Sequence, residues 1–321
     1  MIWRSPQKYP DGRLSTALRA MVVVSGFLLF GCQPTTDRAD SNPAIRVMTF
    51  NIEDLRTADV LRPDHRRVRA AARVIQEVRP DILLINEMSN DAMMEDAAEN
   101  GESAARLFVE SVLSVSQGPG LVPISYETYI PATNTGVASG FDLNNDGLVV
   151  SDYPEPEASG DDGEAPRQTA EQRAYGNDSW GFGTYPGQYG MALFVAPHLE
   201  ILFDSIRTFR EFRWKDMPGA LAPVQPDSVT PWYDYLEWSE MRLSSKNHVD
   251  VPVRLPDSSV IHILASHPTP PAFDGPERRN KLRNHDEIRF WVDYIVGEDY
   301  FVDDSGGSGP LPVGASFVIM G

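Results

Sequence analysis

Residues 45–51 read Ile-Arg-Val-Met-Thr-Phe-Asn, and residues 82–86 read Ile-Leu-Leu-Ile-Asn. Both stretches are rich in apolar and β-branched residues and end in a polar side chain, which is typical of buried strands. The segment between them opens at Pro63 and carries apolar residues at helical spacing, namely Ala71, Val74, Ile75 and Val78. A strand, a helix and a strand in such close succession predict a layered α/β fold.

More strands and helices are predicted farther along the chain. The further strand segments are 125–130, 189–196, 199–209, 248–255, 259–266 and 315–320. Segments 189–196 and 199–209 are expected to form a hairpin that turns at Pro197-His198. One helix is expected over 91–115, and a second is indicated by apolar residues at helical spacing, namely Ile288, Trp291, Val292 and Ile295.

The composition limits the kinds of partner. The 321 residues are 41% hydrophobic, enough for a sizeable core, and carry a formal net charge of −18. Such a charge disfavours a protein that binds nucleic acid mainly by neutralising phosphates. An anionic substrate would have to be met by a few well-placed cations or by a metal ion.

The N-terminus resembles a bacterial lipoprotein signal. A basic region precedes the apolar run 20–30, which is too short to span a bilayer, and Gly31 precedes Cys32, the single cysteine. Residues 1–31 are therefore predicted to be a signal peptide, Cys32 a lipidation site, and 32–43 a polar linker. The protein would be exported and held on a membrane by its lipid, in the periplasm or at the cell surface. A plain secretory signal or an uncleaved anchor is the alternative.

Polar side chains at three strand ends are candidates for chemistry. Asn51 closes the first strand and Glu87 the second, and a carboxylate with an amide oxygen suits a hard ion such as Mg²⁺. A single Glu in such a place is more often solvated, and the pairing with Asn51 raises the metal hypothesis. His267 follows the strand 259–266, where it could contact a phosphate or donate a proton, or simply cap a turn.

Four motifs together resemble the endonuclease/exonuclease/phosphatase superfamily. They are Thr-Phe-Asn-Ile at 49–52, Asp-Ile-Leu-Leu-Ile-Asn-Glu at 81–87, Gly-Gln-Tyr-Gly-Met-Ala at 187–192 and Ser-His-Pro-Thr-Pro-Pro at 266–271. They occur in the family's order, and the resemblance covers about residues 44–321. It implies the deoxyribonuclease-like four-layer α/β sandwich.

The resemblance also implies roles for individual residues. Asn51 would orient the phosphate or the attacking water and assist at the metal, and Glu87 would be the metal carboxylate, with Mg²⁺ or Mn²⁺ as cofactor. Tyr189 would lie near the scissile phosphate, and His267 would be the active-site histidine. A cation for the substrate phosphate is expected between 241 and 252, where Arg242 and Lys246 are equal candidates. These groups would stabilise the charge that develops when water attacks a phosphoester in line.

The end of the sequence departs from the family pattern. There, an apolar strand like 316–320 leads into Gly-Asp-x-Asn, and a later strand supplies an Asp-His pair with the general base. This sequence ends at Gly321, the first residue of that pattern. We therefore expect the C-terminal part of the fold to be missing and these 321 residues alone to show little or no activity.

An irregular stretch, about 131–188, is expected to be an insertion, either functional or disordered. Within it, Asp142, Asn144 and Asp146 followed by Gly147 match the first half of a calcium loop. Position 12 of that loop would be Tyr153 rather than Glu, so an EF-hand is not expected. A non-EF Ca²⁺ loop and a solvated turn both remain open.

Two functions follow from these patterns. The first is an exported, metal-dependent phosphoesterase that acts on a small phosphoester or, less readily, on nucleic acid. The second is a non-catalytic, calcium-binding surface lipoprotein on the same scaffold. No protein partner is indicated. The basic residues Arg278, Arg279, Lys281 and Arg283 would fit either contact with an anionic substrate or a solvated helix start.

Overall fold

The computed structural model describes residues 44–62, 64–94, 103–156 and 167–321. Ala44–Gly321 form one compact unit. The predicted signal peptide, Cys32 and the linker lie outside the described residues and stay predictions. In the described part of the chain, no helix is both long and apolar enough to cross a membrane.

The first sheet holds the two strands from which the prediction started. Its order is β1 (Val47–Leu55), β2 (Ile82–Met88), β4 (Met191–Val195) and β3 (Glu127–Tyr129). β1 and β2 run parallel, as expected for strands joined by a helix, and β4 is antiparallel to both of its neighbours. The carboxyl ends of β1 and β2 therefore meet at one edge.

The second sheet contains the later strands in the order β5 (Glu200–Ile201), β7 (His248–Arg254), β8 (Val260–Ser266) and β9 (Ser316–Met320). The short β6 (Arg207–Thr208) also pairs with β7. β7 and β8 are antiparallel along seven residue pairs, and β9 runs parallel to β8.

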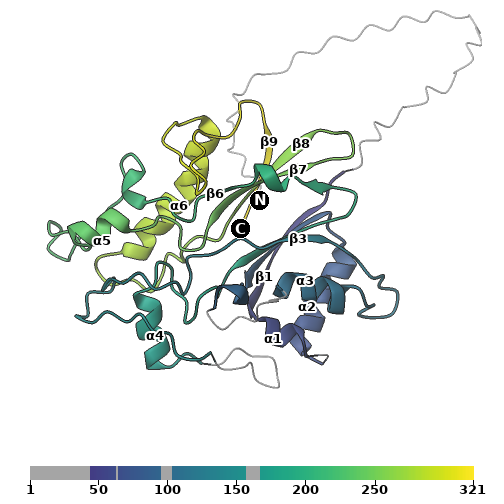
Figure 1. Ribbon diagram of the computed structural model, residues 1–321, viewed down its shortest axis with the longest axis horizontal. Helices are drawn as coiled ribbons and strands as arrows, with labels where there is room; N and C mark the ends of the chain where they lie inside the picture. Colours follow the sequence, from purple (N-terminus) through teal and green to yellow (C-terminus); the bar gives the residue numbers. More distant parts are fainter. Residues whose placement is uncertain (1–43, 63, 95–102, 157–166) are drawn as a thin grey trace, which may run out of the picture. The chain divides into compact units, whose positions relative to one another are not determined.

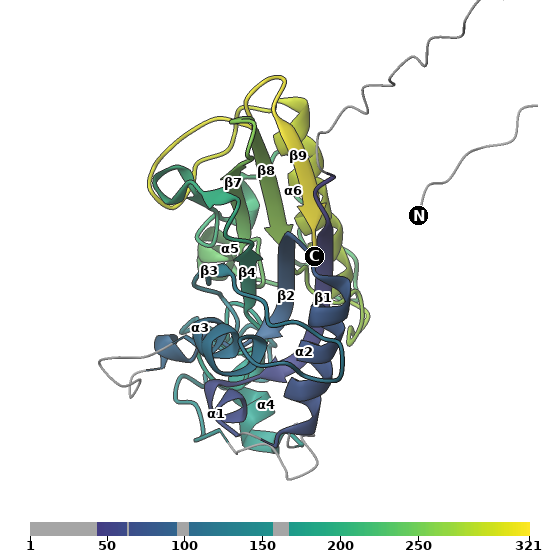
Figure 2. The same ribbon diagram turned by 90° about the vertical axis from the view of Figure 1, so that its right-hand side faces the viewer.

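The two sheets face each other across an apolar layer, and helices cover their outer faces (Figures 1 and 2). Alternate residues of β2 show the division: Ile82 and Leu84 pack between the sheets, whereas Leu83 and Ile85 pack toward the helices. α2 (Arg66–Val78) and α3 (Ala104–Leu107) cover the first sheet, and α6 (Arg279–Val296) covers the second. The predicted four-layer α/β sandwich is confirmed.

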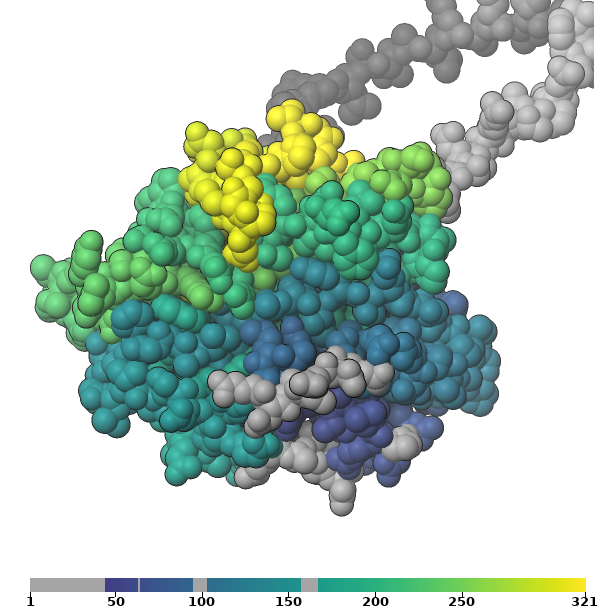
Figure 3. Space-filling model, in the orientation of Figure 1, coloured from purple at the N-terminus to yellow at the C-terminus, as the bar shows by residue number. Residues whose placement is uncertain are grey.

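The two halves of the sequence occupy different parts of this sandwich. On the face seen in Figure 3, residues up to about 190 (purple to teal) fill one side and the later residues (green to yellow) the other. The smaller helical elements lie in the connections: α1 (Thr57–Val60), α4 (Ala170–Asn177), α5 (Tyr235–Glu240) and three short 3₁₀ turns at Asp91–Met93, Phe203–Ser205 and Trp214–Asp216.

The predicted apolar face of the last helix was only partly right, because Trp291 and Ile295 pack on the core whereas two other predicted residues do not. Ile288 and Val292 are 53% and 54% exposed. The face that packs on the sheet mixes charged and aromatic residues at helical spacing: Arg283, Asp286, Glu287, Phe290, Trp291 and Tyr294. The sequence pattern failed here because these charged groups find their hydrogen-bond partners inside the protein.

Two other predicted elements also differ. β4 and β5 do not form a hairpin, because β4 pairs with β2 and β3 in the first sheet and β5 pairs with β7 in the second. The helix expected over 91–115 is interrupted: a 3₁₀ turn precedes residues 95–102, which lie outside the described part. α3 then continues into a π-helical turn, Phe108–Leu113.

The described parts of the insertion pack closely on the segment that precedes β7. Asn134 N donates to Lys246 O at 2.9 Å, and Asn134 Nδ2 donates to Ser244 O at 2.8 Å. A Cβ added at Gly181 would lie 1.9 Å from Ser245 O, so only glycine allows this approach. The insertion thereby becomes part of the wall around Lys246.

Candidate phosphoester site

Glu87 stands at the end of β2 in an uncommon backbone conformation. Its φ is +63°, in the left-handed region that a non-glycine residue seldom adopts. Its N–H donates to Gly190 O at 2.8 Å, and this bond ties the residue to the chain entering β4. Such conformations are found where the surrounding structure enforces them, often at functional sites.

Asn51 and His267 converge on the Glu87 carboxylate; the strand-end positions predicted the first contact, and the family resemblance implied the second. Asn51 Nδ2 donates to Glu87 Oε1 at 2.8 Å, and His267 Nε2 lies 3.2 Å from the same oxygen. Asn51 Oδ1 accepts from Glu53 N at 2.8 Å, which fixes the amide orientation. The two strand ends of the first sheet and the β8 end of the second thus form one hydrogen-bonded cluster.

The surroundings keep Glu87 ionised. Burial raises the pKa of this carboxyl, but the hydrogen bonds from His267 and Asn51 and the charges of His267 and Lys246 outweigh that effect. The pKa of Glu87 is therefore lowered below its usual value. An ionised carboxylate is the form that binds a divalent cation.

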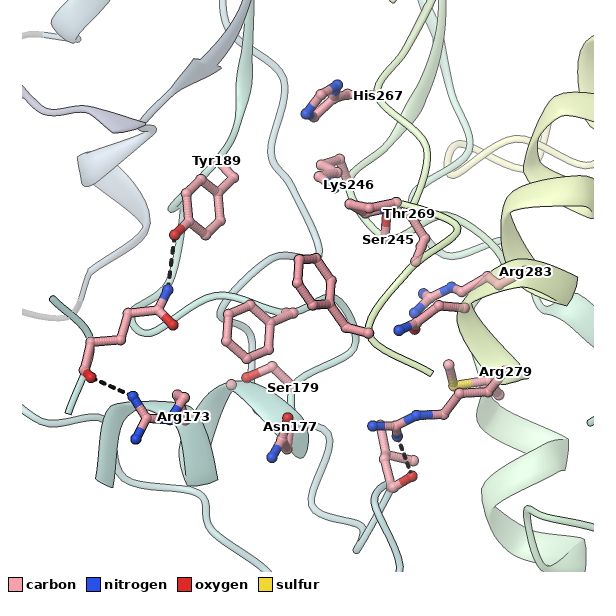
Figure 4. Close-up of a pocket in the computed structure, with 18 of the residues that line it drawn as sticks. Arg173, Asn177, Ser179, Tyr189, Ser245, Lys246, His267, Thr269, Arg279 and Arg283 are labelled. Carbon is pink, nitrogen blue, oxygen red and sulfur yellow. Dashed lines mark hydrogen bonds between the residues drawn. The ribbon is translucent and has the colours of Figure 1, made fainter. Parts of the chain in front are cut away.

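A cavity of about 540 Å³ opens beside this cluster (Figure 4). Glu87, Tyr189, Lys246 and His267 line it together with residues of the insertion and of α6. As far as the structure describes its wall, the cavity carries one carboxylate and four Lys or Arg side chains: Arg173, Lys246, Arg279 and Arg283. In a chain of net charge −18, this local excess of positive charge favours an anionic ligand.

The structure separates the two cations that the sequence could not. Lys246 is buried in the cavity wall, and its Nζ forms no hydrogen bond or ion pair with any residue that the structure describes. Burial lowers the pKa of Lys246 to about 8, against the opposing charges of Glu287 and Glu87. Arg242 is not among the lining residues; its Nη1 donates to Asn134 Oδ1 at 2.6 Å, and its guanidinium lies over the Trp180 ring.

Tyr189 also lines the cavity and also has a left-handed backbone, with φ of +53°. Its hydroxyl accepts a hydrogen bond from Gln168 Nε2 of the insertion at 3.0 Å (Figure 4). Burial, with Asp54 and Glu87 nearby, raises the pKa of Tyr189, so its hydroxyl keeps its proton and can donate to a bound oxyanion.

The donor set at Glu87 suits a hard divalent cation with few protein ligands. Glu87 Oε1 is engaged by Asn51 and His267, whereas Oε2 forms no hydrogen bond to the described residues. Mg²⁺ in phosphoryl-transfer sites is often held by one or two carboxylates plus water and substrate oxygens. Among the described residues, no group of three or more His, Cys, Asp or Glu side chains could hold a metal ion. Asn51 turns its amide nitrogen toward Glu87, so its role as a direct metal ligand stays a prediction.

Four further residues belong to this site. Three of them were not predicted from the sequence, and for Arg283 the sequence left open whether it contacts a substrate or solvent. Ser245 and Thr269 flank the predicted Lys246 and His267, Arg283 comes from α6, and Glu287 lies beneath them. The signal for Arg283 and Glu287 was their spacing with Phe290, Trp291 and Tyr294 along one helix face.

The loop of Asp142, Asn144 and Asp146 is folded on itself by hydrogen bonds between its own residues. Asp142 Oδ2 accepts from Gly147 N at 2.7 Å, and Asn144 Oδ1 accepts from Asp146 N at 2.9 Å. Tyr153, at position 12, packs on the Tyr175 ring. Calcium binding by this loop stays a prediction.

If the loop binds Ca²⁺, calorimetric titration should show one site that is lost in Asp142→Ala. Removal of one of its two carboxylates takes away charge that a Ca²⁺ site needs. Asp204→Ala, at an exposed turn, serves as the control. Identical heats for the parent chain and Asp142→Ala would assign the loop to a solvated turn.

Comparison with known proteins identifies the family. The sequence matches the profile of the Endonuclease/Exonuclease/phosphatase family over residues 48–320, and the chain belongs to this family. Members of the family are usually nucleases or phosphatases and generally use divalent metals such as Mg²⁺. No curated protein matches the chain.

Solved structures of the same family also resemble the chain. An endonuclease/exonuclease/phosphatase from Beutenbergia cavernae DSM 12333 shares 16% identity over 79% of this chain and 45% of its own, with a TM-score of 0.37. A family protein from Leptotrichia buccalis C-1013-b shares 12% over 77% and 61%, with a TM-score of 0.35. ANGEL2, a 2′,3′-cyclic phosphatase in complex with adenosine-2′,3′-vanadate, shares 13% over 86% and 52%, with a TM-score of 0.32. This chain spans about half the length of these structures.

Proposed function

We propose that this chain belongs to an exported, metal-dependent phosphoesterase that hydrolyses a small phosphoester by in-line attack of water. The observation that carries the proposal is the position of the Glu87–Asn51–His267 cluster beside a cavity rich in cations and poor in carboxylates. A cavity of about 540 Å³ has the size of a small-molecule site, which favours a small phosphoester over a nucleic-acid strand.

The residues of the site would share the work of binding and charge stabilisation. Glu87 would hold Mg²⁺ or Mn²⁺, and Asn51 would keep its carboxylate in place. When bound, the ion supplies positive charge to the phosphate and makes water a stronger nucleophile. His267 and Lys246 would contact the non-bridging oxygens of the phosphate, where negative charge increases in the transition state. Tyr189 would donate a hydrogen bond from its protonated hydroxyl.

Export and lipidation at Cys32 are also part of the proposal, and their support is the sequence of residues 1–43 alone. Incorporation of a labelled fatty acid into the chain, and its loss in Cys32→Ser, would test the membrane anchor.

Glu87→Gln should strongly weaken metal binding at the site. The change keeps the size of the side chain and the hydrogen-bonding capacity of one oxygen but removes the charge. We expect Mn²⁺ affinity, measured by calorimetry with phosphate present, to fall roughly 100-fold, because loss of even an outer partner of a metal ligand costs about 10–100-fold. Glu77→Gln, at an exposed carboxylate on α2, should leave the affinity unchanged.

Two results would count against the proposal. Unchanged Mn²⁺ affinity in Glu87→Gln would place the metal elsewhere. A protein that binds Mn²⁺ and phosphate at this site, and whose gene product hydrolyses no phosphoester, would favour the non-catalytic lipoprotein.

A further inference from the structure

Two hydroxyl groups in the cavity wall lack hydrogen-bond partners. Ser245 and Thr269 are 2% and 7% exposed and line the cavity. Ser245 Oγ and Thr269 Oγ1 make no hydrogen bond with any part of the chain that the structure describes. Buried polar groups nearly always have a partner, so two such hydroxyls in one cavity wall point to a ligand.

The backbone around both hydroxyls is held by α6. Glu287 Oε1 accepts from Ser245 N at 2.7 Å, and Glu287 Oε2 accepts from Thr269 N at 2.6 Å. Asn284 Nδ2 donates to Thr269 O at 2.7 Å. One helix therefore fixes the two segments side by side and leaves both hydroxyls without a partner in the described part of the chain.

A buried guanidinium lies next to these hydroxyls. Arg283 is 7% exposed; its Nε donates to Leu243 O at 2.9 Å, and its Nη2 donates to Trp180 O at 2.7 Å and to Arg242 O at 2.9 Å. Among the described residues, its Nη1 has no hydrogen bond and no carboxylate lies within ion-pair distance. A buried cation held by carbonyl oxygens alone is only partly compensated, and an anion in the cavity would complete its environment.

These groups follow one another along the cavity. In Figure 4 the labelled side chains run from His267 through Lys246, Ser245 and Thr269 to Arg283. Orthophosphate alone would occupy only a small part of about 540 Å³. The polar groups beyond Lys246 lie where a second part of the same ligand would reach. Ser245 Oγ and Thr269 Oγ1, each exposed by less than 1 Å² in the free protein, would turn toward it by rotation about χ1.

We propose that Ser245 Oγ, Thr269 Oγ1 and Arg283 Nη1 form a second oxyanion subsite, so that the substrate is a small phosphoester with a second phosphate group. The scissile phosphate would lie beside Glu87 and His267, and this assignment rests on the function proposed above. Lys246 would stand between the two phosphates and contact both.

The test is the binding of bisphosphonates without divalent metal. Methylene-, ethylene- and propylene-bisphosphonate carry two phosphonate groups at increasing separation, and methylphosphonate carries one. With EDTA present, we expect the best bisphosphonate to bind the chain at least about 100-fold more tightly than methylphosphonate, because two hydroxyls contribute about tenfold each. Ser245→Ala/Thr269→Val should reduce the affinity for that bisphosphonate roughly 100-fold, about tenfold per hydrogen bond to a charged group, and leave methylphosphonate binding unchanged.

Both substitutions are nearly isosteric and remove unbonded hydroxyls, so the double variant should fold, which thermal unfolding would verify. Thr269→Ser, which keeps a hydroxyl, should retain most of the affinity. Ser239→Ala, outside the cavity, should retain all of it. Equal binding of methylphosphonate and all three bisphosphonates, or equal losses for both ligand classes in the double variant, would overturn the subsite. Because these measurements exclude metal, they are independent of the Mn²⁺ result for Glu87→Gln.

Discussion

Lys246→Met is expected to stabilise the free protein at pH 7 while it abolishes phosphate binding. The buried ammonium has no partner at hydrogen-bond distance among the described residues, and its pKa of about 8 shows that folding disfavours its charge. A fall from 10.5 to about 8 corresponds to a cost on the order of 3 kcal/mol, at about 1.36 kcal/mol per pKa unit. Methionine fills a similar volume without charge, so we expect a gain of about 1–3 kcal/mol.

The stability gained in Lys246→Met should depend on pH. The pKa of Lys246 is lower in the folded than in the unfolded chain, so the unfolded chain binds more protons between about pH 8 and 10.5. The contribution of Lys246 to the free energy of unfolding therefore rises across that window, and its penalty is fully present below pH 8. The advantage of Lys246→Met should be largest at pH 7 and should vanish near pH 10.5.

Urea unfolding of both proteins at pH 7 and pH 10, with phosphate binding by calorimetry, would measure both effects. Lys281→Met, at an exposed lysine on α6, should change neither quantity. A Lys246→Met protein that loses stability, or that binds phosphate as the parent does, would refute the assignment of Lys246 as an anion-binding residue maintained at a cost in stability.

The positions and ends of several strands could be predicted because the buried strands contain apolar runs that stop at polar residues. Asn51, Glu87 and His267 each follow such a run, and parallel pairing of β1 with β2 brings the first two together. The contact with His267 requires the second sheet to face the first. The resemblance to the family implied this arrangement of the sheets, but the spacing of residues did not.

Burial of charge was the part that the sequence could not show. Nothing in the sequence favoured Lys246 over Arg242. In the structure the insertion packs against the segment that precedes β7, and Lys246 lines the cavity whereas Arg242 does not. Glu287 lies in a charged stretch that resembles a solvated helix surface, yet it is fully buried. The sequence also could not show that β4 and β5 belong to different sheets. Both strands carry apolar residues next to a short turn, a pattern that fits a hairpin equally well, and tertiary packing decides between the two arrangements.

Glu287→Gln is expected to weaken both the fold and the anion site. The fully buried carboxylate accepts from Ser245 N and Thr269 N, so an amide would set an N–H₂ donor against one of these donors. The change also removes the negative charge that raises the pKa of Lys246, Arg283 and His248 against burial. Breaking a buried charged arrangement by removal of one partner costs about 3–5 kcal/mol, and we expect a loss of that order.

The neighbouring Asp286 provides a matched control on the same helix. It is equally buried and accepts from Trp214 Nε1 and Leu221 N, both at 2.7 Å, but these groups lie outside the cavity wall. Asp286→Asn should therefore lose a similar amount of stability and keep its affinity for phosphate.

Glu287→Gln, measured where it is still folded, should bind phosphate at least tenfold more weakly at pH 7. Its affinity should also decline at a lower pH than in the parent, because the pKa of Lys246 falls further when Glu287 is neutral. An unshifted pH profile in Glu287→Gln, or an equal loss of affinity in Asp286→Asn, would show that Glu287 only stabilises the fold and does not position the anion site.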